Sequence, residues 1–192
     1  MKRSTLLAFA MSAHLIPVAA WAMVKPLRVI APELLGLTCT ADRICTDDPH
    51  RLAEARALLL DAQSFVAADL GPLRTRPTAV FCATAECSSR FGLGRSVALS
   101  VGTLGVAFSD KAWRPHFVRH ELIHQRQNEQ LGVIDAWLFK PSWLIEGMAY
   151  ARSHDPRRPL PEPLESWRAN YQEWERSIPR STTLWSAAES VQ

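Results

Sequence analysis

The stretch His120-Glu121-Leu122-Ile123-His124 is the most informative part of this chain. It has the form H-E-x-x-H, and the surrounding pattern predicts a helix. Residues four apart on a helix lie on the same face, separated along the axis by one turn of about 5.4 Å. Both imidazoles can therefore reach one metal ion, and Glu121 can reach a water molecule beside that ion. The pattern predicts zinc-assisted hydrolysis in which a carboxylate acts as the general base.

A catalytic zinc site requires a third protein ligand and one open position. Glu146 is the candidate, in the segment Trp143-Leu144-Ile145-Glu146-Gly147-Met148-Ala149-Tyr150. The interval after His124 can hold the end of one helix, a connection and the first turns of another. Two helices packed side by side could direct His120, His124 and Glu146 toward one point. We therefore expect these three side chains to bind one Zn²⁺ per chain.

With these two motifs the chain resembles the gluzincin metallopeptidases, whose third zinc ligand is a glutamate on a second helix. The matching segments are H-E-L-I-H at 120–124 and W-L-I-E-G-M-A at 143–149, within a stretch from about Val118 to Ser153. The resemblance implies that His120, His124 and Glu146 bind zinc and that Glu121 is the catalytic base. It also implies a zincin-like fold in a small, single-domain form.

The chain departs from the aminopeptidases of that superfamily. Those enzymes carry a G-x-M-E-N segment before the metal motif, which recognises the amino terminus of the substrate. The corresponding stretch here, residues 100–108, reads S-V-G-T-L-G-V-A-F. An aminopeptidase is therefore not implied, and we expect an endopeptidase that acts on peptides or proteins.

Residues 1–22 have the features of a signal peptide. Lys2 and Arg3 supply positive charge, an apolar run extends from Leu6 to Ala20, and Ala20-Trp21-Ala22 fits a cleavage site. Cleavage after Ala22 would leave residues 23–192 as a single domain, and cleavage after Ala20 is a near alternative. The run is short and interrupted for a membrane-spanning helix, although an uncleaved anchor is the rival interpretation. We expect a periplasmic or secreted protein without stable membrane insertion after cleavage.

The four cysteines agree with export. An even number of cysteines in an exported chain indicates disulfides. Of the three possible pairings we favour Cys39–Cys45 with Cys82–Cys87, because each of these bonds closes a short loop. A cysteine-rich zinc site is the rival interpretation, but these spacings fit two-residue zinc knuckles poorly.

The charge of the chain is close to balanced. The net charge is +3, and the predicted signal peptide contributes Lys2 and Arg3. No block of lysine and arginine indicates binding to nucleic acid or to a membrane surface. The expected partner is a peptide or protein substrate, and the oligomeric state stays open.

The rest of the chain predicts an α+β fold, with a small mixed sheet packed on helices. Turn signals and apolar spacing predict helices at 48–70, 115–132, 141–155 and 164–178, and strands at 78–83, 96–101 and 104–109. By the resemblance, residues 96–109 are the candidates for an edge strand that binds the substrate backbone over the cleft.

Hydrolysis would also need a hydrogen-bond donor that stabilises the oxyanion, the negatively charged oxygen formed when water attacks the substrate carbonyl. The residue that supplies this donor is harder to assign. Tyr150 lies four residues after Glu146 and on the same helix face, so it is the first candidate. His154, another turn along, and Tyr171 on the last helix are further candidates, although each can instead have a packing role. His116 shares a helix face with the two motif histidines. One zinc ion cannot easily bind three histidines stacked along a straight helix, so we expect His116 at the surface or the cleft rim.

Three functions are compatible with these residues. The first is an exported zinc peptidase. The second is an exported zinc-binding or partner-binding domain without turnover, against which the intact Glu121 argues. The third is a zinc amidase that acts on a non-protein amide, such as a cell-wall link, because the zinc chemistry would be the same.

Overall fold

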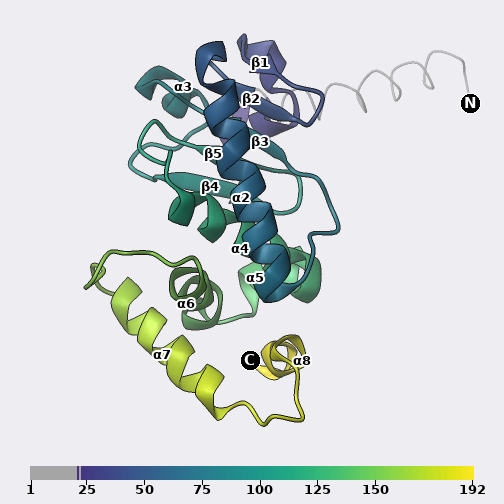
Figure 1. The fold of residues 1–192 in the computed structure, drawn as a ribbon, viewed down its shortest axis with the longest axis vertical. Helices are drawn as coiled ribbons and strands as arrows, with labels where there is room; N and C mark the ends of the chain where they lie inside the picture. The colour runs from purple at the N-terminus through teal and green to yellow at the C-terminus, as the bar shows by residue number, and fades with distance from the viewer. Residues whose placement is uncertain (1–20, 22) are drawn as a thin grey trace, which may run out of the picture.

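The computed structural model describes residue 21 and residues 23–192, so the predicted signal peptide lies almost entirely outside the described residues. The fold is a mixed α+β arrangement, as predicted, with helices packed around a five-stranded sheet (Figure 1). Along the chain the 3₁₀ helices (η), strands and α-helices are η1 (Lys25–Ile30), η2 (Pro32–Leu35), β1 (Thr38–Cys39), β2 (Ile44–Thr46), η3 (Pro49–Arg51), α2 (Leu52–Leu70), β3 (Thr78–Phe81), α3 (Ala85–Arg90), β4 (Ala98–Val101), β5 (Gly105–Phe108), α4 (Pro115–Leu131), α5 (Val133–Leu138), α6 (Ser142–Arg152), α7 (Leu164–Ser177) and α8 (Leu184–Ser190).

The strands lie in the order β1-β2-β3-β5-β4. The inner strands β2, β3 and β5 are parallel, whereas β1 and β4 run antiparallel at the two edges. Parallel neighbours need a long crossover, which α2 supplies between β2 and β3. The strands β4 and β5 lie at two of the predicted strands and pair as a hairpin, with the turn at Gly102-Thr103. This topology leaves β4 as an edge strand beside α4.

Both faces of the sheet are covered. Successive side chains of a strand point to opposite faces, and all four residues of β3 are buried. Ala79 and Phe81 belong to the larger core, which contains residues of α2 and α4, whereas Val80 belongs to a second cluster with Val29 of η1. Figure 1 shows α2 crossing one face of the sheet. The sheet is therefore a central layer on which α4 is held.

The helices α2 and α4 begin and end close to the predicted residues. Asp48 caps η3 by accepting a hydrogen bond from the backbone N–H of His50, and α2 continues from there to Leu70, just before Gly71. Pro115 begins α4, because its fixed φ suits the first turn. Gly132, with a φ of +84°, ends α4 in the left-handed region that favours glycine.

The later helices form a second packed group below the sheet in Figure 1. The helix α6 crosses α7 so closely that a Cβ atom on Gly147 would lie 2.3 Å from the backbone oxygen of Trp167. Only a residue without a side chain permits that approach. The glycine next to Glu146 therefore fixes how near α6 can come to α7.

The two disulfides are Cys39–Cys45 and Cys82–Cys87, which confirms the predicted pairing. Cys39 and Cys45 lie directly opposite each other in the β1–β2 hairpin. The second bond joins the residue after β3 to α3. No cysteine is left to form the rival cysteine-rich zinc site, and the two bonds fit an exported protein.

The sequence pattern missed several short elements, namely β1, β2, α3, α5, α8 and the 3₁₀ helices. Two- and three-residue strands carry too little alternation to be recognised without their partners. The helix predicted at 141–155 ends earlier, at Arg152, and His154 adopts a φ of +58°. In the part of the chain that the structure describes, no helix is both long and apolar enough to cross a membrane.

Candidate metal centre

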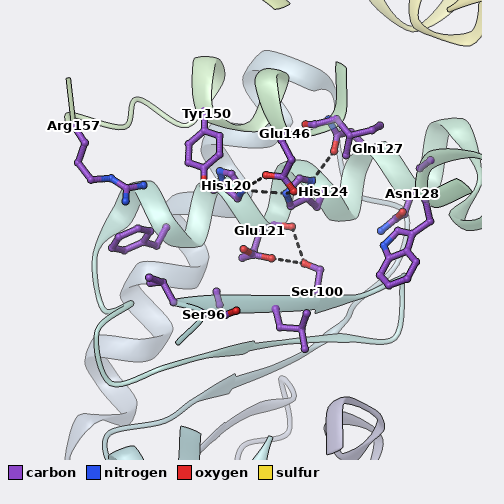
Figure 2. A pocket seen from close by; sticks show the side chains of 17 residues that line it. Ser96, Ser100, His120, Glu121, His124, Gln127, Asn128, Glu146, Tyr150 and Arg157 are labelled. Atoms are coloured by element: carbon purple, nitrogen blue, oxygen red, sulfur yellow. Dashed lines mark hydrogen bonds and ion pairs between the residues drawn. The ribbon is translucent and has the colours of Figure 1, made fainter. Parts of the chain in front are cut away.

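The residues of the H-E-x-x-H motif lie on α4, on the side of the helix that faces α6 and β4. Val118 and Leu122 on the same helix are completely buried in the larger core. That packing directs His120, Glu121 and His124 into a cleft (Figure 2). His120 and Glu121 are each only 8% exposed. The apolar side of α4 therefore sets the orientation of its polar side.

Three potential ligand atoms converge in this cleft. His120 Nε2 lies 3.0 Å from His124 Nε2, and Glu146 places its oxygens 3.4 Å from His120 Nε2 and 3.5 Å from His124 Nε2. Ligand atoms bound to a tetrahedral zinc at about 2.0–2.1 Å would lie about 3.3 Å apart. The separations and the two-histidine, one-carboxylate donor set both fit a zinc ion with one open position.

Gln127 fixes the tautomer of His124. The Gln127 side-chain amide donates to the backbone oxygen of Ile145 at 2.9 Å, which leaves its Oε1 to face His124 Nδ1 at 2.8 Å. An acceptor at that place requires a proton on Nδ1, so the Nε2 atom of a neutral His124 carries a free lone pair. The same glutamine links α4 to the backbone of α6, the helix that provides Glu146.

The charges around the centre favour a cation. Burial lowers the pKa of His124, but hydrogen bonding to Glu146 and its negative charge outweigh burial and raise that pKa to about 9. Burial raises the pKa of Glu146, but the hydrogen bonds and charges of His120 and His124 hold it well below its usual range. Glu146 is therefore an anion held against two imidazoles. A metal cation can take the place of the protons on these imidazoles.

Glu121 is held by a residue that the motifs do not include. Ser100 on β4 donates a hydrogen bond from Oγ to Glu121 Oε2 at 2.7 Å. The edge strand therefore contacts the predicted base directly, as the dashed line in Figure 2 shows. This bond orients one oxygen of the carboxylate and leaves the other for a second partner.

Tyr150 lies beside the metal centre. Its ring packs against that of His120, with centroids 4.4 Å apart, and it lines the same cleft. Burial, with a smaller contribution from the charge of Glu146, raises the pKa of Tyr150 to about 12. The hydroxyl therefore remains protonated at neutral pH and can donate a hydrogen bond.

The other candidate donors lie elsewhere. His154 packs edge-on against Phe65 of α2, because α6 ends before reaching it. The Tyr171 hydroxyl donates to Glu175 and accepts from Arg152, in a network that joins α6 to α7. Neither residue lines the cleft.

His116 does not have the exposed position that we expected. It is only 8% exposed and packs against Phe117. Burial lowers its pKa, against the opposing charge of Asp155 in the segment after α6. That segment covers the first turn of α4, a long-range contact that helical spacing alone cannot reveal.

The cleft around the metal centre has a volume of about 350 Å³. Residues 96–100 of the β4 segment form one wall, and α4 and α6 form the others. Figure 2 shows Arg157 and Ser96 toward one end, and Gln127 and Asn128 toward the other. Trp137 of α5, which is 73% exposed, also lines the cleft. The cleft therefore extends along β4 on both sides of the metal centre.

Sequence reasoning missed Ser100, Gln127 and Arg157. Gln127 lies three residues after His124 on α4, so helical spacing offered a signal for it. Ser100 and Arg157 carry no comparable local signal, because they reach the cleft from a strand and a loop. A further potential ligand group in the described part of the chain, Glu33 with Cys39 and Cys45, is not available to a metal because its cysteines are joined in a disulfide.

Comparison of the chain with protein-family models, curated proteins and solved structures found no match.

Proposed function

We propose that this chain is an exported zinc-dependent peptidase of the gluzincin type that hydrolyses internal peptide bonds. The observation that carries this proposal is the convergence of His120, His124 and Glu146, with Glu121 beside them on an open cleft. When bound, a zinc ion would act as a Lewis acid, polarising the carbonyl group of the bond to be cleaved and lowering the pKa of a water molecule. The two histidines and Glu146 would hold that ion.

Glu121 is the residue that moves the proton. Its carboxylate accepts a proton from the attacking water and returns it to the nitrogen of the leaving amine. Ser100 keeps the carboxylate in place between these two transfers through its bond to Oε2. Tyr150, whose hydroxyl stays protonated and whose ring packs against His120, would donate to the oxygen that gains negative charge.

The edge strand favours a peptide over a non-protein amide. β4 is the last strand of the sheet, and its segment lines the cleft next to the metal centre. The outer edge of such a strand presents backbone donors and acceptors that an extended peptide can pair with. An amide outside a peptide backbone has no run of N–H and C=O groups to pair along that edge.

The bond between Ser100 and Glu121 argues against a binding domain without turnover. A site that only holds metal has no use for an oriented base beside it. The two disulfides support export, and the predicted signal peptide would direct it to the periplasm or the exterior.

The proposal can be tested with the exported form and its Glu121→Gln variant. Elemental mass spectrometry should find about one zinc per chain in both proteins, because Glu121 is not a ligand. A randomised peptide mixture, analysed by mass spectrometry, should show internal cleavage by the parent and at least a ~1,000-fold loss in the variant. A chelator should abolish cleavage, and added zinc should restore it.

Two results would contradict the proposal. A chain that binds no zinc after supplementation has no catalytic metal centre. Zinc binding without cleavage of any peptide would favour the partner-binding or amidase alternatives.

A further inference from the structure

We propose that Arg157 makes the cleft selective for peptides that carry a carboxylate close to the bond that is cleaved. This inference rests on the proposed function and names its substrate class. Of the described residues that line the cleft, Arg157 alone carries a permanent positive charge. The other charged groups there, Glu121 and Glu146 with the two histidines, belong to the metal centre.

Asp155 holds Arg157 from behind. The guanidinium donates to the Asp155 carboxylate through Nε and Nη2, and Asp155 is only 5% exposed. Burial raises the pKa of Asp155, but the hydrogen bonds and charge of Arg157 hold it below its usual value. Asp155 is therefore a fixed anion that engages one edge of the guanidinium.

The guanidinium also interacts with the Tyr150 hydroxyl, and its remaining N–H groups are left for a ligand. An arginine has five N–H groups, and the fork with Asp155 uses the single N–H of Nε and one of the two on Nη2. The Arg157 side chain is 39% exposed, whereas that of Asp155 is 2% exposed. A second carboxylate can therefore bind through the Nη1 side of the fork, in the paired geometry that arginine prefers.

Two aromatic rings restrict the position of the guanidinium. Its carbon lies 4.9 Å from the centre of the Phe117 ring and 5.9 Å from that of Tyr150. Figure 2 shows the group directed along the cleft toward Tyr150. A side chain that is already ordered loses less conformational entropy on binding, so its contribution to affinity is larger than that of a free surface arginine.

The distance to the metal centre places the recognised group. Tyr150 contacts both Arg157 and His120, so the guanidinium carbon lies no more than about 10 Å from the His120 ring. An extended peptide advances ~3.3 Å per residue. The carboxylate should therefore belong to a residue within about three positions of the cleaved bond, as an acidic side chain or as the terminal carboxylate.

The test is a binding measurement in the zinc-loaded Glu121→Gln protein, which holds peptides without cleaving them. Fluorescence anisotropy compares labelled randomised peptides in which one position is fixed as Glu or as Gln. A second pair carries a free or an amidated carboxyl terminus, which separates the two sources of the carboxylate. In one of these pairs, we expect the peptide with the carboxylate to bind at least ~10-fold more tightly than the peptide without it.

Substitution of Arg157 should remove that preference. Arg157→Gln should bring the ratio of affinities close to one, whereas Arg158→Gln, an exposed neighbour outside the cleft, should leave it unchanged. If Arg157→Gln fails to fold because Asp155 loses its partner, the paired substitution Asp155→Asn with Arg157→Gln removes both charges together. Thermal unfolding of each variant checks its fold.

Equal binding of acidic and neutral peptides by the zinc-loaded Glu121→Gln protein would overturn the inference. A preference for acidic peptides that survives the loss of Arg157 would also overturn it. Cleavage of the same peptides by the unsubstituted protein is read separately. Cleavage without acidic preference leaves the peptidase standing and removes the role of Arg157. Acidic preference in binding without any cleavage retains that role and removes the peptidase.

Discussion

The helices α4 and α6 both contribute side chains to the candidate metal centre, but they are positioned in different ways. The helix α4 rests on the sheet, and Arg126 near its end donates to the backbone oxygen of Leu70 in α2. Among the described elements, the main partner of α6 is α7 and not the sheet, and the two helices pack closely at Gly147. His120, Glu121 and His124 come from the first helix, and Glu146 with Tyr150 comes from the second.

The difference shows which distances in the candidate centre are set within one helix and which depend on packing between helices. On α4, one turn of helix sets the separation of His120 and His124, wherever that helix lies. Glu146 reaches them only because α6 is held at the right distance by α7 and by Gln127. We therefore expect substitutions in α6 to move Glu146 away from His120 and His124.

The largest effect on metal binding should come from Glu146→Ala. It removes one of three ligands, and loss of an outer-shell partner alone typically costs about 10–100-fold in metal affinity. We expect a loss of more than ~100-fold, measured by competition with a chromogenic chelator. Glu173→Ala, at an exposed glutamate of α7, is the matched control. Equal zinc affinity in the two variants would exclude Glu146 as a ligand.

Gly147→Ala should shift α6, and with it Glu146, without removing any proposed ligand. In a helix without neighbours this change would stabilise by up to ~1 kcal/mol. Here the new Cβ meets the backbone of Trp167, and such overpacking typically costs about 1–3 kcal/mol. Denaturant unfolding should therefore show a loss of stability, and zinc affinity should fall by roughly 10-fold. A gain in stability would show that α6 and α7 are not in close contact.

Ser100→Ala should affect the base but not the metal. It removes the hydrogen bond to Glu121, and bonds to charged groups contribute about 1.5–3 kcal/mol. We expect kcat to fall by roughly 10-fold or more with zinc content unchanged, and Ser100→Thr to restore part of it. Ser96→Ala, at another serine of the same cleft wall, should have little effect. An unchanged kcat in Ser100→Ala would show that Glu121 needs no positioning from β4.

The disulfides should have the smallest effect on the metal centre. Each closes a loop of only a few residues, which predicts about 2 kcal/mol of stabilisation from loop closure. Neither bond involves a residue of α4, of α6 or of the cleft lining. Reduction should lower stability in denaturant while leaving zinc content unchanged in the folded protein. Thiol titration of the unfolded, unreduced chain should find no free cysteine.

Much of the fold follows from local patterns. The predicted bounds of α2, α4 and α7 lie close to those observed, because apolar spacing, prolines and glycines act within a few residues. The strands β4 and β5 were predicted for the same reason, as two strands separated by Gly102-Thr103. The pairing of β2 with β3 and the short hairpin of β1 and β2 were not, since their partners are far apart in sequence or too short to show alternation.

By itself the sequence determined that His120, Glu121 and His124 share one helix face, because helical periodicity is a local property of the chain. It also indicated Glu146 as their partner, and the short cysteine spacings indicated the disulfides. Only the tertiary structure decided that Ser100 holds Glu121, that Gln127 orients His124 and that Arg157 reaches the cleft. Most of these contacts join residues far apart in sequence, and their geometry depends on the packing of α4, α6 and β4 against the rest of the core.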